Sequence, residues 1–300
     1  MARWVSLLCN LGILGGLGLW SAMAQVKTKA VLVVTPPTSP YQEVAEGFRR
    51  LMGQTPDMEI RMAPLQGPPD EFRRNHESFL RSPAYTVVAV GADAYRTVRD
   101  QVEPSRTVAV LMAVPPGGPR HTISAVADPV QVLRLIGEMW GKNVRLSLLL
   151  GGSARSEEPV FQNAAQVHGM SLRTAVVTEA AQAVDVLKNL VDESDVFLLY
   201  PDPEVLTAVP PDAAIRYCHE RRVVAAALFE GALRMGATLA FVPRYSEVPD
   251  ILRQILKYPE QFAPVAYPGV ERVVVNRSAL AMIRLNPPPS KLKGVTIVFQ

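Results

Sequence analysis

The stretch Lys29-Ala30-Val31-Leu32-Val33-Val34-Thr35 decides the fold class, because it is a continuous aliphatic and β-branched run with no polar alternation. Such a run is typical of a strand that is buried on both faces, as in a parallel sheet covered by helices. The breaker Pro36-Pro37-Thr38-Ser39-Pro40 follows, and residues 41–52 then carry apolar side chains at helical spacing. A strand, a turn and an amphipathic helix in this order predict the first unit of an α/β sheet.

The same alternation of strand and helix recurs along the rest of the chain. The patterns predict further strands at 58–63, 85–91, 107–114, 122–126, 145–150, 172–177, 195–200, 223–228, 238–242 and 272–276, and helices at 70–81, 92–101, 128–140, 159–168, 180–190, 211–221, 229–235, 248–256 and 278–285.

A segment rich in proline and glycine, 115–120, divides this series into two lobes. We expect an N-terminal lobe at 25–120, to which part of 243–270 can contribute, and a C-terminal lobe with the hinge crossings at 121–300. Alternation of strand and helix predicts parallel sheets with right-handed crossovers. The expected fold class is therefore α/β, with two doubly wound parallel-sheet lobes joined by a hinge. The ligand groove of such a fold lies at the carboxyl ends of the strands.

The first 24 residues have the features of a secretory signal. A short basic start, Met1-Ala2-Arg3-Trp4, precedes an uncharged run at 5–20 and the small-x-small pattern Ala22-Met23-Ala24. The alternative is an uncleaved anchor, but a run of about 16 residues is short for a bilayer that needs about 20. We expect cleavage after residue 24 of the 300, which leaves 276 residues beginning at Gln25, and a periplasmic location. No later apolar segment is long enough to span a membrane, so we expect no membrane insertion of the mature chain.

Composition and charge exclude several classes of function. The apolar set makes up 48% of the chain, which excludes disorder as the main state, and 31 basic against 28 acidic residues give a formal charge of +3. That charge is too small and too scattered for a nucleic-acid partner. Of the two cysteines, Cys9 lies in the predicted signal and leaves Cys218 alone. We therefore expect two cores that are stable without a disulfide.

Signatures of catalytic and metal sites are missing from the sequence. The four histidines do not stand at metal-ligand spacing, no phosphate-binding loop occurs, and Gly151-Gly152-Ser153 lacks the second glycine of a nucleophile elbow. We therefore expect a protein that is not an enzyme and that uses no metal and no cofactor. A glycosylation sequon occurs at Asn276-Arg277-Ser278, but its position before a predicted helix favours an N-cap role for Asn276.

The ends of the predicted strands carry the candidate ligand contacts, and each has two interpretations. Gly91-Ala92-Asp93 either presents helix N–H groups to a ligand or only permits a tight turn. Tyr41 either closes over a ligand or packs at the start of a helix. Asp202, in the loop Tyr200-Pro201-Asp202-Pro203-Glu204, either caps the next helix or accepts hydrogen bonds from a ligand amine.

Four segments taken together resemble a known family. They are Thr86-Val87-Val88-Ala89-Val90-Gly91-Ala92-Asp93-Ala94, Leu198-Leu199-Tyr200-Pro201-Asp202-Pro203, Gly236-Ala237-Thr238-Leu239-Ala240 and Val273-Val274-Val275-Asn276-Arg277-Ser278-Ala279-Leu280-Ala281. Their order resembles the substrate-binding proteins of ABC transporters of the tryptophan/tyrosine type, the "ABC sub bind" family. The resemblance runs over nearly the whole mature chain.

The resemblance implies a type I periplasmic-binding fold and a specific set of partners. The chain would bind a small-molecule ligand between its lobes and deliver it to an inner-membrane ABC permease, and we expect a monomer. The loops that carry ligand contacts in the family correspond here to Ser39, Tyr41, Gly91, Ala92, Asp93, Tyr200 and Asp202. The other strand ends add Val114, Ser153 and Phe229 as expected ligand contacts.

Several positions depart from the family pattern. Ala92 stands where the family has a hydroxyl residue, Asp202-Pro203-Glu204 replaces Asp-Asn-Thr, and Thr122-Ile123-Ser124-Ala125 replaces a Thr-Gly-Val segment. An amino-acid specificity therefore does not transfer to this chain. The lost hydroxyls and the proline-rich loops keep a second hypothesis open, in which the chain is an exported sensor or scaffold of the same fold that docks a protein partner.

Overall fold

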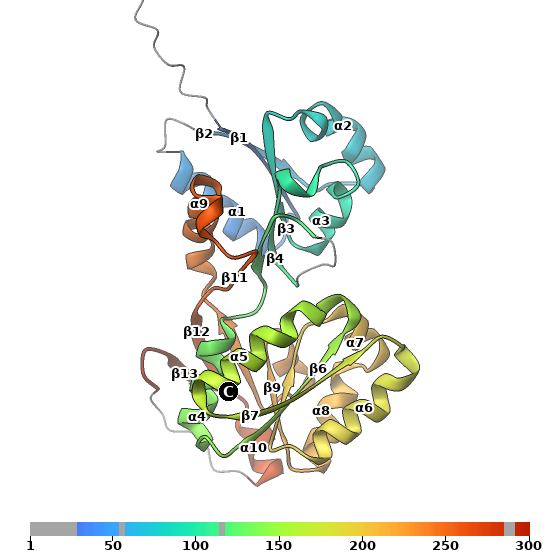
Figure 1. Ribbon diagram of the computed structural model, residues 1–300, viewed down its shortest axis with the longest axis vertical. Coiled ribbons are helices and arrows are strands. Elements are labelled where there is room, and N and C mark those ends of the chain that lie inside the picture. The colour runs from blue at the N-terminus through green and yellow to red at the C-terminus, as the bar shows by residue number, and fades with distance from the viewer. Residues whose placement is uncertain (1–28, 54–57, 114–117, 285–291) are drawn as a thin grey trace, which may run out of the picture.

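The structure is a computed structural model that describes residues 29–53, 58–113, 118–284 and 292–300. The predicted signal peptide and Val114 lie outside the described residues. The chain forms two α/β lobes, each built on one sheet, that are stacked along the long axis of the molecule (Figure 1). Among the described helices, none is long and apolar enough to cross a membrane.

The first lobe has a six-stranded parallel sheet in the order β11-β5-β4-β3-β1-β2. Its strands are β1 (Lys29–Thr35), β2 (Met58–Pro64), β3 (Tyr85–Val90), β4 (Thr107–Met112), β5 (His121–Ser124) and β11 (Val265–Ala266). Its helices are α1 (Tyr41–Met52), α2 (Pro69–Arg81), α3 (Ala92–Val98) and α9 (Val248–Lys257), with the short 3₁₀ turns η1 (Pro104–Arg106) and η5 (Pro259–Gln261).

Burial of β1 on both faces confirms the expectation from its sequence. Val31 and Val33 pack in one core with α1 and α9, whereas Leu32 and Val34 pack in a second core with α2 and α3. Successive side chains of a strand point to opposite faces, so a run without polar residues supplies both cores at once. Helices cover both faces of this sheet (Figure 1).

The second lobe has a seven-stranded sheet in the order β13-β12-β10-β9-β8-β6-β7. Its strands are β6 (Arg145–Gly151), β7 (Ser171–Val177), β8 (Val196–Leu199), β9 (Val224–Ala227), β10 (Leu239–Pro243), β12 (Val270–Val275) and β13 (Thr296–Phe299). Its helices are α4 (Pro129–Trp140), α5 (Glu158–His168), α6 (Ala180–Asp192), α7 (Pro203–Ala208), α8 (Pro211–Glu220) and α10 (Arg277–Ile283), with the 3₁₀ turns η2 (Gly152–Glu157) and η3 (Glu230–Met235). A further 3₁₀ turn, η4 (Tyr245–Glu247), lies between β10 and α9.

The structure departs from the predicted pattern in several elements. β12 runs antiparallel to β10, because the chain enters β12 directly from the first lobe and not through a helix packed on the same sheet. β5, which we placed in the second lobe by setting the boundary at 120, pairs with β4 in the first sheet. Residues 230–235 form a 3₁₀ turn where we predicted a helix, and the strands β11 and β13 and the helix α7 were not predicted.

The chain crosses between the lobes three times, from β5 to α4, from β10 to α9 and from β11 to β12. Hydrogen bonds join these crossings to one another. Asp128 N donates to Pro268 O (2.8 Å), Arg244 N donates to Gly269 O (2.7 Å), and Gly269 N donates to a carboxylate oxygen of Glu247 (2.9 Å). The three segments therefore form one bonded hinge, and the space between the lobes opens beside it.

Candidate functional site: the cleft between the lobes

A cleft of about 1120 Å³ lies between the two lobes next to the hinge. The first lobe lines it mainly with the start of α1, the second lobe with the loop from β9 into η3, and the hinge with η4 and β12. Its lining includes Ser39, Tyr41, Phe229, Glu230, Tyr245 and Arg272.

The Tyr41 ring lies directly against the turn at Gly91. Gly91 has a φ of +87°, and a β-carbon at this residue would lie 3.0 Å from Tyr41 Cε1. Glycine is therefore required here twice, for its backbone conformation and for the close approach of the ring. Tyr41 packs at the start of α1 and also lines the cleft; that its ring closes over a ligand stays a prediction.

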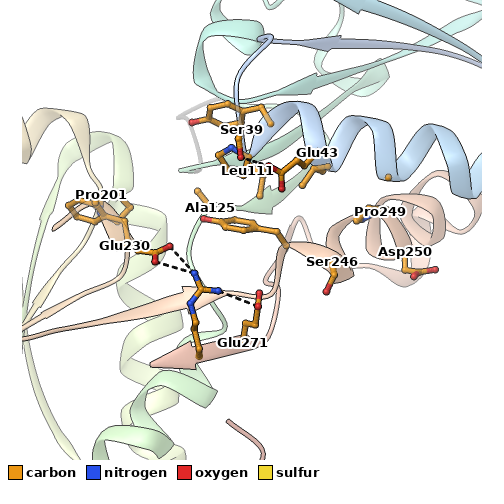
Figure 2. A pocket seen from close by; sticks show the side chains of 18 of the residues that line it. Ser39, Glu43, Leu111, Ala125, Pro201, Glu230, Ser246, Pro249, Asp250 and Glu271 are labelled. Carbon is orange, nitrogen blue, oxygen red and sulfur yellow. Dashed lines mark hydrogen bonds and ion pairs between the residues drawn. The ribbon is translucent and has the colours of Figure 1, made fainter. Parts of the chain in front are cut away.

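One arginine and two glutamates form the polar centre of the cleft. Arg272 Nη2 donates to both carboxylate oxygens of Glu230 at 3.1 Å, and Arg272 Nη1 donates to Glu271 Oε1 at 3.3 Å. Figure 2 shows Glu230 and Glu271 bonded to the same guanidinium. The arginine side chain is 33% exposed and the two glutamates 46% and 45%. Two carboxylates around one guanidinium leave one negative charge that no partner balances within this cluster.

Tyr245 joins this charged centre to the first lobe. Burial is the main cause that raises the pKa of its hydroxyl, and the nearby Tyr41, Glu230 and Glu271 raise the pKa further while Arg272 lowers it. The Tyr245 hydroxyl therefore stays neutral at physiological pH and can donate or accept a hydrogen bond.

Leu111 and Ala125 line the cleft on the side of the first sheet (Figure 2). Leu111 has a φ of +57°, which is rare for a residue with a branched side chain, and the register of β4 against β5 shifts next to it. A shift of this kind turns a side chain that would otherwise alternate with its neighbours. The irregular end of β4 therefore presents an apolar residue to the cleft.

The structure brings only some of the predicted site residues to the cleft. Ser39, Tyr41 and Phe229 line it, and Gly91 lies beneath the Tyr41 ring. Ala92 and Asp93 are exposed but lie outside the lining, and Asp93 pairs with Arg96. The Ser153 amide donates to a carboxylate oxygen of Glu204 at the start of α7 (3.2 Å), and Ser153 is not among the residues that line the cleft.

Asp202 is completely buried and binds the backbone of its own lobe. One carboxylate oxygen accepts from Gly151 N (2.6 Å) and the other from Glu204 N (2.9 Å), so Asp202 caps α7 and ties the ends of β6 and β8 together. Tyr200 is 1% exposed, and Pro201 is the residue of this loop that lines the cleft. Of the two interpretations of Asp202, the structure shows the cap.

A buried glutamate, Glu157, lies with two tyrosines between the second lobe and the hinge. Glu157 is 0% exposed and accepts a hydrogen bond of 2.8 Å from the hydroxyl of Tyr267, which belongs to the crossing from β11 to β12. Burial raises the pKa of Glu157 to about 7, although Tyr267 and Tyr200 each oppose the rise. The Tyr200 hydroxyl is near, but neither it nor Glu157 Oε1 reaches full hydrogen-bond geometry with a described residue.

Sequence reasoning missed Glu230, Tyr245 and Arg272. Two signals point to them in retrospect. Glu271 and Arg272 are adjacent charged residues inside the apolar run of β12, where burial makes charge unfavourable without a function or a partner. Glu230 and Tyr245 each follow the end of a strand, which is where ligand contacts gather in parallel sheets. Within the described residues, no three His, Cys, Asp or Glu side chains come together as metal ligands.

Comparison with known proteins identifies the fold. No protein-family model matches the chain, and no curated protein matches it in sequence. Among solved structures, a conserved domain protein from Vibrio cholerae is 17% identical, with a TM-score of 0.56 over 91% of this chain and 100% of that one. An ABC domain from Streptococcus pneumoniae in complex with L-Trp is 14% identical, with a TM-score of 0.56 over 90% and 99% of the two chains.

A third solved structure shows the same arrangement without a ligand. It is the open, ligand-free form of a substrate-binding protein with adhesive properties from Clostridium difficile, 14% identical, with a TM-score of 0.59 over 91% of this chain and 99% of that one. Each of these similarities covers 90% or 91% of this chain. The chain therefore has the type I periplasmic-binding fold that the resemblance in its sequence implied, in common with substrate-binding proteins of ABC transporters.

Proposed function

We propose that the protein is the exported solute-binding component of an ABC importer and that it binds a small organic solute in the cleft between its lobes. The observation that carries this proposal is a cleft beside a bonded hinge, with Tyr41 from one lobe and Glu230 from the other on its walls. In this proposal the chain carries out no catalysis, reaches the periplasm through the signal at residues 1–24, remains a monomer and delivers its solute to an inner-membrane permease.

The geometry suggests how binding would be coupled to movement of the lobes. A solute that contacts only one lobe has no preference between the open and the closed arrangement. A solute that contacts both Tyr41 and Glu230 gains its full set of contacts only when the lobes approach, so its binding shifts the population towards closure. The permease would then distinguish the loaded form from the empty form by the distance between the lobes.

Native mass spectrometry of the protein recovered from its own periplasm tests the proposal directly. We expect a low-mass ligand that leaves on denaturation, a rise in melting temperature when that ligand is added back, and a smaller radius of gyration in solution scattering. The variant Phe229→Ala shortens a cleft wall and should weaken the shift in melting temperature. Phe79→Ala, far from the cleft on α2, is the matched control. Absence of a ligand, together with no stabilisation by any amino acid, amine, organic acid, purine or peptide, would contradict the proposal.

A second candidate function is a sensor or scaffold that docks a protein partner. It is favoured by Asp202, which the resemblance placed at the ligand but which is fully buried, and by Tyr41, which covers the turn at Gly91. Under this alternative, protein purified from the periplasm carries no low-mass ligand and instead retains one partner protein at fixed stoichiometry. A ligand found in the native mass spectrum rules it out.

A further inference from the structure

The charged residues that line the cleft fall into an outer set and an inner set. The outer set contains two acids, Glu43 and Asp250, and two arginines, Arg50 and Arg234, and all four are exposed. The two acids have further partners, because Glu43 accepts from the Ser39 hydroxyl and Asp250 pairs with Arg253 at 2.9 Å. The four outer charges sum to zero, Arg253 beside Asp250 adds one positive charge, and solvent screens all of these exposed side chains.

The inner set is not balanced. Arg272 is shared between Glu230 and Glu271, both of which are bonded to it, so the three side chains carry a net charge of −1. Arg272 is 33% exposed, whereas Glu230 and Glu271 are 46% and 45% exposed, so solvent screens the two glutamates nearly as much as it screens Asp250 of the outer set, at 53%. A ligand carboxylate that approached Arg272 would lie beside two carboxylates. A ligand cation would be attracted by both glutamates and would meet a single opposing charge.

Three aromatic side chains share the cleft with the inner set. They are Tyr41, Tyr245 and Phe229. Tyr245 is close enough to the inner set for the charges of Glu230, Glu271 and Arg272 to change the pKa of its hydroxyl. The face of an aromatic ring attracts a cation within about 6 Å of its centre. A neutral tyrosine hydroxyl also accepts a hydrogen bond from an N–H group. Carboxylates and aromatic rings together are the groups that recognise an ammonium ion attached to an apolar body.

We propose that the solute is an organic ammonium ion, with its nitrogen at Glu230 and Glu271 and its apolar part against Tyr41, Tyr245 and Phe229. This inference rests on the proposed function and names the ligand class of the same cleft. Arg272 acts in it as a specificity residue. Its positive charge neutralises one of the two carboxylates, so one negative charge remains for the ligand to balance. This charge balance favours a monocation over a dication.

The test uses four probes that share a phenyl ring and differ in charge. They are 2-phenylethylamine, phenylalanine, 3-phenylpropionate and 2-phenylethanol, with choline and putrescine as aliphatic cations. Binding to the exported, dialysed protein is measured by calorimetry and thermal shift. We expect the monocations to bind most tightly and to lose affinity as salt is added. Glu230→Gln and Glu271→Gln should each weaken monocation binding about tenfold or more, while Glu179→Gln, an exposed control outside the cleft, should change it little.

The variant Arg272→Gln distinguishes the ligand classes. For an ammonium ligand, removal of this arginine keeps or increases affinity and increases the affinity for putrescine most. For an anionic or zwitterionic ligand, the same change removes the only inner cation and abolishes binding. The melting temperature of each variant without ligand, together with its circular dichroism, shows whether it is folded.

Each result has a defined meaning. Preference for 3-phenylpropionate, phenylalanine or 2-phenylethanol, or loss of binding in Arg272→Gln, overturns the inference about ligand class and leaves the proposed function standing. A low-mass ligand in the native mass spectrum that carries no ammonium group does the same. If no probe binds and no low-mass ligand is found, the proposed function fails and this inference fails with it. Preferential binding of the monocations, dependent on both glutamates, supports it.

Discussion

Replacement of Glu157 by glutamine should stabilise the protein above neutral pH and have little effect in acid. The carboxyl group is 0% exposed, and its pKa rises from 4.5 to about 7 mainly through burial. A carboxyl group with a raised pKa binds its proton more tightly in the folded state than in the unfolded state. Its contribution to the free energy of unfolding is therefore most favourable below about pH 4.5 and decreases until about pH 7.

The size of the effect follows from the shift. Each pKa unit corresponds to about 1.4 kcal/mol, so ionisation of Glu157 costs the folded state about 3 kcal/mol above pH 7. Glutamine keeps an oxygen to accept the Tyr267 hydroxyl, and its NH₂ group can donate to the unpartnered Tyr200 hydroxyl. We therefore expect Glu157→Gln to be equal to the parent within about 1 kcal/mol at pH 4.5 and more stable by about 3 kcal/mol at pH 8.

Urea unfolding of both proteins at half-unit steps from pH 4.5 to 8 measures this difference. All other titrating groups are shared by the two proteins and cancel in the comparison. An exposed control, Glu179→Gln, makes the same replacement of an acid by an amide away from the core. The reasoning is refuted if the advantage of glutamine stays constant or decreases as pH rises. That result would mean that the tyrosine hydroxyls stabilise the carboxylate more than burial disfavours it.

Three further changes test other parts of the structure. Gly91→Ala should destabilise the fold by about 1–3 kcal/mol through backbone strain and by more through the clash with the Tyr41 ring. Gly141→Ala is the control, because Gly141 has a similar φ of +89° but open space around it. Equal losses of stability in the two variants, measured by thermal unfolding, would contradict the packing of Tyr41 against Gly91. Asp202→Asn should cost about 1–3 kcal/mol with no ligand present, because an NH₂ group would face a backbone N–H, and an unchanged urea midpoint would argue against the buried cap. Cys218 is 0% exposed and burial raises the pKa of its thiol to about 12, so a thiol reagent should label it only on unfolding, and rapid labelling of the native protein would refute this.

Much of the architecture was predictable because it depends on strong local patterns. Buried strands such as β1 and β3 are continuous aliphatic runs, and helices such as α1 and α9 place their apolar residues at regular spacing. The positions of these elements and the α/β class of the fold follow from those patterns. What local patterns do not contain is the direction and partner of a strand. The aliphatic run 273–275 of β12 looks like that of any neighbouring strand, yet β12 runs antiparallel to β10, and the two residues of β11 are too few to show any period.

The cleft was predictable in place but only partly in detail. The rule that ligands gather at strand ends led to Ser39, Tyr41 and Phe229, all of which line it. The same rule failed for Asp202, because its buried side chain satisfies two backbone N–H groups of its own lobe. It also missed Arg272, which reaches the cleft from within a hinge strand. Contacts that depend on how two lobes meet involve residues far apart in the chain, and no local pattern reports them.

The position of α9 has a consequence for the order in which the molecule acquires its structure. Val248, Leu252 and Ile255 of this helix are part of the core beneath β1, and the ammonium group of Lys29 donates to the carbonyl oxygen of Leu256 at 2.8 Å. When the ribosome has made only the first half of the chain, α9 has not yet been synthesised, and the core of the first lobe is therefore incomplete. The first lobe is completed only after more than 100 further residues have been made, most of which belong to the second lobe. Assembly of the two lobes is thus interdependent, and we expect them to unfold in one cooperative transition.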